Sequence, residues 1–307
     1  MKEENHLHHQ SLLHLKRTQL QHLLSPKKLN SATTYLLFFT VAYALGFLSS
    51  YTIIQQTTPQ LQSPPQPHIS DSELFRFNST CADPVPSKLG RQTLLDRLFN
   101  GSSPFDAFPP PHAVPLLRQK RIKGWGSTGA VFETLIRRVK PRTIVEVGSF
   151  LGASAIHMAE LTRRLGLKTQ ILCIDDFRGW PGFRDRFRDI KMVNGDVMLM
   201  YQFMQNVAQS NFTEVILPVP FSSGSALAQL CDLGVYADLI EVDAGHDFHS
   251  AWADINRAHT ILRPGGVIFG HDYFTAADNR GVRRAVNLFA KVKGLKVIPH
   301  GQHWVLA

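Results

Sequence analysis

From residue 127 onward, short apolar runs alternate with stretches in which apolar residues recur at helical spacing. The runs are rich in β-branched residues and end near glycine, proline or acidic residues, which is typical of buried strands in a parallel sheet. They predict strands at residues 143–147, 170–174, 215–219, 238–242, 266–269 and 296–298. The stretches between them predict helices at residues 131–138, 153–165, 197–207, 226–233, 248–260 and 282–293.

The repeated strand–helix order predicts an α/β fold, because parallel neighbours are joined by right-handed helical crossovers. Residues 300–303 predict a turn into a closing strand at 304–306, so we expect the last strand to be antiparallel. Prolines interrupt residues 72–124 and break any long element there. We expect this stretch to form a packing arm over a catalytic domain at residues 125–307.

Residues 34–54 carry no charge and, at about 1.5 Å per residue, could cross one hydrocarbon core as a helix. We interpret them as a transmembrane signal anchor, with a cleaved signal peptide as the alternative. Residues 1–33 are polar and predict a disordered tail, and residues 55–71, rich in proline and glutamine, predict an extended stalk. The tail is predicted to be cytosolic, because basic residues precede the anchor: Lys16, Arg17, Lys27 and Lys28.

Three Asn-x-Ser/Thr sequons follow the predicted anchor, at Asn78, Asn100 and Asn211. Such triplets are common by chance, but all three lie on the predicted lumenal side. The sequence therefore predicts a single-pass type II membrane glycoprotein of the Golgi or another endomembrane, with its catalytic domain in the lumen.

The net charge of +9 and the pI of about 9.6 bear on which partners the protein binds. The basic residues are spread along the chain rather than clustered with aromatics, which favours acidic surroundings or an anionic substrate and no nucleic-acid partner. Cys173 lies in an apolar run and is predicted to be a core residue, whereas Cys81 could pair only in an oxidising compartment. Because there are three cysteines, at least one thiol stays unpaired within the chain.

The stretch from Thr143 to Ser154 combines a strand, a glycine turn and the start of a helix. Gly148 and Gly152 leave the turn without side chains, so a ligand can lie against its backbone near the unpaired N–H groups of the helix N-terminus. Glu146 adds a carboxylate at the strand end. The spacing lacks the Gly-x-Gly-x-x-Gly pattern of dinucleotide-binding turns, and no Gly-Lys-Ser/Thr marks a Walker loop.

Further polar residues follow the other predicted strands, at the edge where ligands of open α/β sheets bind. Asp175 follows the second strand and could accept hydrogen bonds from ribose hydroxyls. Ser225 follows the third strand, as an adenine contact or as a helix N-cap. The fourth and fifth strands are followed by two acids and two histidines: Asp243, His246, His271 and Asp272. Two carboxylates at one edge repel unless a cation lies between them, and oxygen ligands suit Mg²⁺.

The turn from Glu146 to Gly152 resembles motif I of class I S-adenosylmethionine-dependent methyltransferases, in which an acid-x-Gly-x-x-x-Gly turn wraps the methionine part of the cofactor. Residues 238–246, 262–273 and 281–286 resemble the methyltransferase 24 group. That group is similar to macrocin O-methyltransferase and cephalosporin hydroxylase-type proteins, and more distantly to metal-dependent catechol O-methyltransferases. The resemblance covers residues 125–307.

The resemblance implies a Rossmann-like class I methyltransferase with a mostly parallel seven-stranded sheet, here with one N-terminal transmembrane helix. It implies S-adenosylmethionine-dependent O-methylation, and the predicted topology favours a small-molecule or glycan acceptor of the secretory pathway. The implied cofactor-binding residues are Glu146, Gly148, Ser149, Gly152, Ser154, Asp175, Ser225 and Asp243.

By the same resemblance, Asp243 and Asp272 would hold a divalent ion such as Mg²⁺, and His246 or His271 would take the acceptor proton. Catechol-type enzymes have Asp-Asn after the fifth strand, whereas this chain has His-Asp-Tyr, so a third protein ligand stays unassigned.

Several alternatives stay open. An α/β enzyme with another nucleotide cofactor would need the Gly-x-Gly-x-x-Gly turn that is missing, and a non-catalytic scaffold would not need the strand-end acids that are present. Asp243 and Asp272 could cap their strands without a metal, and His246 could make only a structural hydrogen bond. Residues 176–188 predict either a cationic lid or, slightly favoured, a solvated loop with two anchoring aromatics.

Overall fold

The structure, a computed structural model, describes residues 40, 43 and 80–307. The predicted tail, membrane anchor and stalk, residues 1–71, lie outside the described residues except for 40 and 43. Within the described part of the chain, no helix combines the length and the apolar character that a membrane crossing needs.

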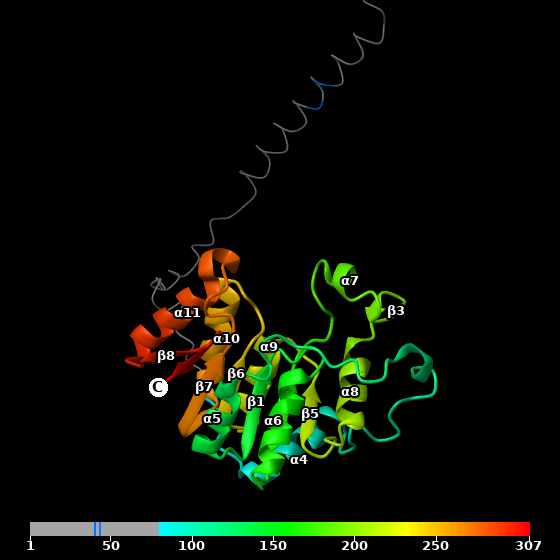
Figure 1. The fold of residues 1–307 in the computed structure, drawn as a ribbon, viewed down its shortest axis with the longest axis horizontal. Helices are drawn as coiled ribbons and strands as arrows, with labels where there is room; N and C mark the ends of the chain where they lie inside the picture. Colours follow the sequence, from blue (N-terminus) through cyan, green and yellow to red (C-terminus); the bar gives the residue numbers. More distant parts are fainter. Residues whose placement is uncertain (1–39, 41–42, 44–79) are drawn as a thin grey trace, which may run out of the picture. The chain divides into compact units, whose positions relative to one another are not determined.

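A seven-stranded sheet forms the centre of the domain, in the order β5-β2-β1-β6-β7-β9-β8 (Figure 1). Neighbouring strands from β5 to β7 are parallel, and β9 is antiparallel to both of its neighbours. The predicted fold, with its antiparallel closing strand, is confirmed. In chain order the strands are β1 (Thr143–Val147), β2 (Gln170–Ile174), β5 (Ile216–Val219), β6 (Ala237–Val242), β7 (Leu262–Gly270), β8 (Val297–His300) and β9 (His303–Leu306).

Helices cover both faces of the sheet, because alternate strand residues point to opposite sides and both sides are apolar. One face packs against α9 (Ser223–Asp232), α10 (Phe248–Thr260) and α11 (Ala277–Lys293). The other packs against α5 (Ala130–Val139), α6 (Ala153–Arg164) and α8 (Leu199–Gln209). This burial leaves the carboxyl ends of the parallel strands as the edge at which polar groups gather.

Some predicted boundaries differ from the structure. β7 begins at Leu262, four residues before the predicted strand, because Leu262 pairs with Ala237 ahead of a register shift. α9 begins at Ser223, since the hydroxyl of Ser222 caps its first turn. α11 is assigned from Ala277, but residues 278–280 have left-handed backbone angles, so its regular turns begin close to the predicted start at Val282.

The sequence analysis did not identify four short elements. They are α7 (Phe183–Arg186), the paired strands β3 (Met192–Val193) and β4 (Asp196–Val197), and the 3₁₀ helix η2 (Val114–Leu116). The predicted arm also contains the helix α4 (Ser87–Leu98).

The arm is tied to the domain at the sheet edge opposite the strand carboxyl ends. Arg91 of α4 donates to the carbonyl of Thr213, just before β5, at 2.7 Å, and Leu94 is fully buried. Cys81 and Cys231 form a disulfide between the arm and α9, while Cys173 is free and buried, as predicted.

We predict that loss of this disulfide destabilises the domain. Cys81→Ser should lower the free energy of unfolding by about 2–4 kcal/mol, because the open chain regains the entropy of a long loop; the two cysteines are 150 residues apart. Thermal unfolding with and without a reductant measures the effect. Reductant should not change the unfolding of the Cys81→Ser/Cys231→Ser double variant. Equal midpoints for the oxidised and reduced wild type would contradict the prediction.

Candidate active site

The glycine turn after β1 lies directly against the end of β6. Gly148 has φ 94°, and a Cβ atom there would overlap the carbonyl oxygen of Asp243. Gly152 has φ 81° and caps α6, and a Cβ atom there would lie 3.1 Å from the ring of Phe203. Both positions therefore require glycine, and at these two positions no side chain covers the backbone of the turn at the N-terminus of α6.

Asp175, at the end of β2, holds this turn in place. Its Oδ2 accepts the backbone N–H groups of Ser149 and Phe150, at 3.1 and 2.8 Å, and its Oδ1 accepts that of Phe177 at 2.7 Å. Burial raises the pKa of Asp175, and these hydrogen bonds oppose the rise. The residue predicted as a ribose acceptor thus also shapes the turn, which the sequence did not indicate.

Glu146 is fully buried on β1, and its Oε1 accepts the hydroxyl of Ser154 from the first turn of α6. Its other oxygen has no hydrogen-bond partner among the described residues, and neither does the buried hydroxyl of Ser149. Glu241 of β6 lies in register beside Glu146 and is equally short of a partner at Oε2. Burial raises the pKa of both carboxyls.

The prediction did not include Glu241. The one available signal was an acid two residues before Asp243, between the apolar residues Ile240 and Val242 of β6.

Ser225 lies exposed in the first turn of α9. The alternative that it caps this helix is wrong, because Ser222 is the N-cap and accepts the N–H of Ser225 at 3.4 Å. A contact between Ser225 and adenine remains a prediction.

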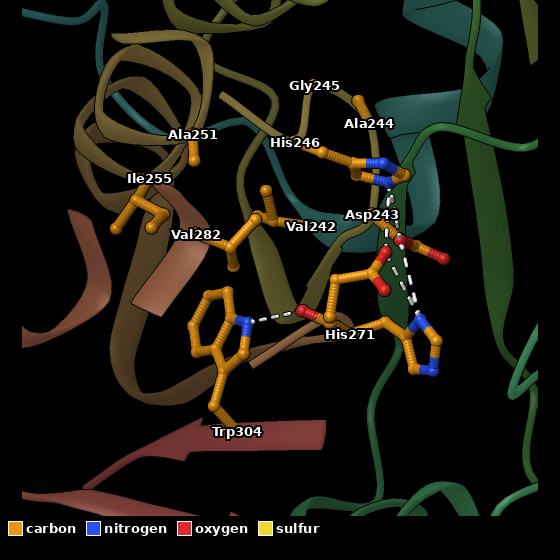
Figure 2. A pocket seen from close by; sticks show the side chains of 11 residues that line it. Val242, Asp243, Ala244, Gly245, His246, Ala251, Ile255, His271, Val282 and Trp304 are labelled. Atoms are coloured by element: carbon orange, nitrogen blue, oxygen red, sulfur yellow. Dashed lines mark hydrogen bonds and ion pairs between the residues drawn. The ribbon is translucent and has the colours of Figure 1, made fainter. Parts of the chain in front are cut away.

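Four predicted residues meet at the ends of β6 and β7, and Figure 2 shows three of them, Asp243, His246 and His271. Nε2 of His246 lies 2.9 Å from Oδ2 of Asp272 and 3.9 Å from Oδ1 of Asp243. Nδ1 of His271 lies 3.4 Å from Oδ2 of Asp272 and 3.9 Å from Oδ1 of Asp243. We call Asp243, His246, His271 and Asp272 the acid–histidine cluster.

The pocket beside it is lined by Val242, Asp243, Ala244, Gly245, His246, Ala251, Ile255, His271, Asp272, Val282 and Trp304.

Local contacts fix the end of β7 under this cluster. Gly270 lies so close to the backbone of Val242 and the indole of Trp304 that no side chain would fit. Trp304 donates its indole N–H to the carbonyl of His271 at 2.9 Å (Figure 2). Asp272 has φ 62°, and its Oδ1 accepts the hydroxyl of Thr275 at 2.5 Å. An aspartate tolerates this left-handed backbone better than most residues do.

The charges of the cluster reinforce each other. Asp243 and Asp272 raise the pKa of His246 to about 10, against the lowering effect of burial. Burial would raise the pKa of Asp272, but hydrogen bonds from His246, His271 and Thr275 hold it well below its usual range. Asp272 likewise raises the pKa of His271. Without a bound cation, His246 is therefore protonated at neutral pH and pairs with the nearer carboxylate, Asp272.

Residues 118–127 reach this edge of the sheet, and residues 125–127, which were predicted as the start of the domain, continue the arm. Gln202 of α8 bonds both the N–H and the carbonyl of Arg118, at 2.8 Å each. Asn206 donates to the carbonyls of Arg121 and of Leu151, in the glycine turn, at 3.0 and 2.9 Å. A Cβ atom at Gly126 would overlap the imidazole of His271. The arm thus touches both the glycine turn and the acid–histidine cluster.

The arginine-rich stretch after β2 is anchored through its aromatics. Phe183 and Phe187 are 2% and 5% exposed, so these two aromatics anchor the stretch, whereas its role as a cationic lid or a solvated loop stays a prediction. Phe150 of the glycine turn packs on Phe187 with ring centroids 5.0 Å apart. Arg121 forms an ion pair with Asp189, which joins the stretch to the arm.

Residues 145–273 match the methyltransferase 24 family, described as a methyltransferase domain. The matched segment begins in β1 and ends just after Asp272, so it contains the glycine turn and the whole acid–histidine cluster. Together with the sheet order, this match to less than half of the chain supports the expected S-adenosylmethionine-dependent methyltransferase domain.

Solved structures similar to the chain include methyltransferases. Cofactor-bound Rv0187 from MTB is 18% identical, covers 73% of this chain and 98% of its own, and has a TM-score of 0.45. An O-methyltransferase from Bacillus cereus in complex with SAH is 18% identical, with coverages of 70% and 96% and a TM-score of 0.42. The O-methyltransferase TomG from Streptomyces achromogenes in complex with SAM is 14% identical, with coverages of 73% and 90% and a TM-score of 0.42.

Because these TM-scores lie below 0.5, the assignment rests on the sheet order and the family match. No curated protein matches the chain.

We predict that Asp272→Asn lowers the pKa of His246 from about 10 toward the ordinary value of about 6.5, because the nearer carboxylate is lost. Histidine NMR titration of the metal-free protein measures this, with His246→Gln to assign the resonance. Folding raises the pKa of His246, so its stabilising effect is present below about pH 6.5 and is lost as the pH rises through 10. The destabilisation by Asp272→Asn should therefore shrink over that range. An unchanged pKa of His246 in the variant would contradict the assigned ion pair.

Proposed function

We propose that the chain is an S-adenosylmethionine-dependent O-methyltransferase that acts on a hydroxyl group of a small-molecule or glycan acceptor. One observation carries the proposal: the glycine turn lies directly against the strand end that supplies Asp243, so a cofactor site and a proton-accepting cluster share one edge. A hydroxyl acceptor must lose its proton as it is methylated, and a cluster of two histidines and two carboxylates supplies groups that take it.

The residues at the glycine turn fit the cofactor. Gly148 and Gly152 keep the turn free of side chains at the N-terminus of α6. Glu146 and Ser149 present buried polar atoms without partners near this turn. S-adenosylmethionine would supply an electrophilic methyl group: a bond forms between the acceptor oxygen and the methyl carbon, the bond from that carbon to sulfur breaks, and S-adenosylhomocysteine is left. The turn orients that methyl group, and positioning of this kind accounts for much of the rate of such a transfer.

The cluster also fits a divalent cation. Ligand atoms of Asp243, His246 and Asp272 all lie within 4.8 Å of one another. Oxygen and imidazole donors of this kind hold Mg²⁺, Mn²⁺ or Zn²⁺. A cation held there would lower the pKa of an acceptor hydroxyl and orient it. His246 would be the third protein ligand that the sequence left unassigned.

The two histidines differ in access, which separates their roles. The side chain of His246 is 50% exposed and can meet an entering acceptor, whereas that of His271 is 10% exposed and covered by Gly126. We therefore assign proton acceptance to His246 or to His271 Nδ1 according to whether a cation occupies the cluster. With a cation bound to His246, only the Nδ1 of His271 is left to take the proton. Without one, His246 must first lose the proton that Asp272 stabilises.

The alternatives gain less support. A dinucleotide cofactor would need a turn that this chain lacks. A scaffold has no need for four titratable groups at the cofactor edge, whereas strongly shifted pKa values such as that of His246 gather at functional sites.

We predict that the purified full-length protein binds S-adenosylmethionine and S-adenosylhomocysteine saturably in calorimetric titrations. Asp175→Ala should weaken binding at least tenfold, because the glycine turn loses two of its backbone hydrogen bonds. Asp176→Ala is the matched control, since its side chain is exposed and bonds only Arg178. Separate titrations with Mg²⁺ should show one site that is lost in Asp243→Asn and Asp272→Asn.

These titrations have distinct contrary outcomes. No binding of either nucleoside by folded protein would overturn the methyltransferase proposal and favour the scaffold. Cofactor binding with no response to Mg²⁺, Mn²⁺ or Zn²⁺ would remove the metal and leave the histidines as the proton acceptors.

We further propose that the domain lies in the lumen of the Golgi or a related endomembrane, on a type II anchor at residues 34–54. Two features support this placement besides the charge pattern of the sequence. The Cys81–Cys231 disulfide requires an oxidising compartment to persist. The sequon residues Asn100 and Asn211 are both exposed, at turns where a glycan has room.

We predict that the chain made in eukaryotic cells carries N-glycans on Asn100 and Asn211. Peptide N-glycosidase should increase its mobility on a gel, and Asn100→Gln and Asn211→Gln should each remove one glycan, because both sequons would face the glycosylation machinery. Asn194→Gln is the control, since this exposed asparagine lies outside any sequon. An unglycosylated chain with reduced cysteines would contradict the lumenal placement.

A further inference from the structure

Two of the four tryptophans are exposed, and they lie together. Trp252 and Trp304 are 7% and 0% exposed, whereas Trp125 and Trp180 are 44% and 41% exposed. The exposed pair have ring centroids 6.3 Å apart. Large aromatic surfaces that stay in contact with water beside a functional site are typical of ligand contacts.

Both indoles rest on the same two phenylalanines. Phe150 lies 5.3 Å from Trp125 and 5.7 Å from Trp180, and Phe187 lies 6.1 and 5.7 Å from them. We call these four side chains the aromatic platform. Because Phe187 is buried, the platform is supported from below and offers its indoles to solvent.

The chain around Trp125 places the platform between the two parts of the candidate active site. A Cβ atom on Gly124 would lie 2.9 Å from Cβ of Ala153, the first residue of α6. On the other side of Trp125, Gly126 packs against the imidazole of His271. Phe150 is itself part of the glycine turn. A molecule lying on the platform would therefore be next to both the cofactor turn and the acid–histidine cluster.

The surroundings of the platform are positively charged. Residues 176–188 contain four arginines and two aspartates, and residues 118–125 contain four basic residues and no acid. Nζ of Lys123 lies 5.8 Å from the ring centroid of Trp125. Arg178, Arg186 and Arg188 are exposed, and within residues 80–307 none of these three forms an ion pair. These cations are available to an anionic ligand.

We propose that the platform is an acceptor subsite for an acidic sugar, a pyranose that carries a carboxylate. This inference rests on the proposed function and names its substrate class. The C–H face of a pyranose packs on an indole, and Lys123 and Arg178 pair with the carboxylate. A sugar also presents the hydroxyl that the reaction needs, directed toward the acid–histidine cluster. The platform exposes two indole rings and no extended basic groove, which favours a sugar over a nucleic acid strand as its ligand.

The test uses the full-length protein saturated with S-adenosylhomocysteine and titrated with trigalacturonic acid, with maltotriose as the neutral sugar of equal length. Trigalacturonic acid should change the tryptophan fluorescence saturably and bind at least tenfold more tightly than maltotriose in calorimetry. Trp125→Phe/Trp180→Phe should abolish the fluorescence change, because the two remaining tryptophans are buried.

Matched variants separate stacking from charge. Trp125→Ala/Trp180→Ala should weaken trigalacturonic acid binding at least tenfold. Trp125→Phe/Trp180→Phe should bind this sugar more tightly than the alanine variant and less tightly than the wild type. Lys123→Gln/Arg178→Gln should weaken the binding of trigalacturonic acid and leave the affinity for maltotriose unchanged. Arg138→Gln, an exposed arginine in the last turn of α5, should change neither.

The contrary results are distinguishable. Retained S-adenosylhomocysteine binding without a saturable response to trigalacturonic acid would overturn the subsite and leave the proposed function standing. Equal affinity for the acidic and neutral sugars would overturn the assignment of an anionic acceptor. Failure to bind S-adenosylhomocysteine would overturn the proposed function and the subsite with it.

Discussion

The contact between the glycine turn and the end of β6 is the constraint on which the site depends. Gly148 lies so close to the carbonyl of Asp243 that any side chain would force the two strand ends apart. Since β1 and β6 are paired in register, this contact fixes the cofactor turn relative to the acid–histidine cluster. A methyl donor and a proton acceptor must be aligned to within a fraction of an ångström, and a backbone contact in a packed sheet sets such a distance more firmly than flexible side chains could.

Buried polar side chains extend this constraint to the arm. Gln202 and Asn206 of α8 are 2% and 0% exposed. The amide of Gln202 bonds the backbone of the arm, and that of Asn206 bonds carbonyls of both the arm and the glycine turn. A buried amide left unpaired would be strongly unfavourable, so these bonds specify one position for the arm. The arm then places Trp125 at the candidate active site, because the next residue, Gly126, packs against the imidazole of His271.

The acid–histidine cluster is held together by opposite charges rather than by apolar packing. Asp272 has a left-handed backbone and depends on His246, His271 and Thr275 for its depressed pKa. In the metal-free protein the proton on His246 balances one carboxylate. In the function we propose, a divalent cation would take the place of that proton. The state of the cluster would then set which histidine takes the proton of the methylated hydroxyl.

The sequence alone determined the strand–turn–helix unit at residues 143–165, the α/β order and the acids at the strand ends, because these depend on neighbours in the chain. The tertiary structure decided what depends on distant segments: the pairing of Cys81 with Cys231, the three backbone bonds to Asp175, and the burial of Glu241 beside Glu146. The aromatic platform belongs to this second group. Its rings come from the arm, the glycine turn and the stretch after β2, and only the packing of the folded chain brings them onto one surface.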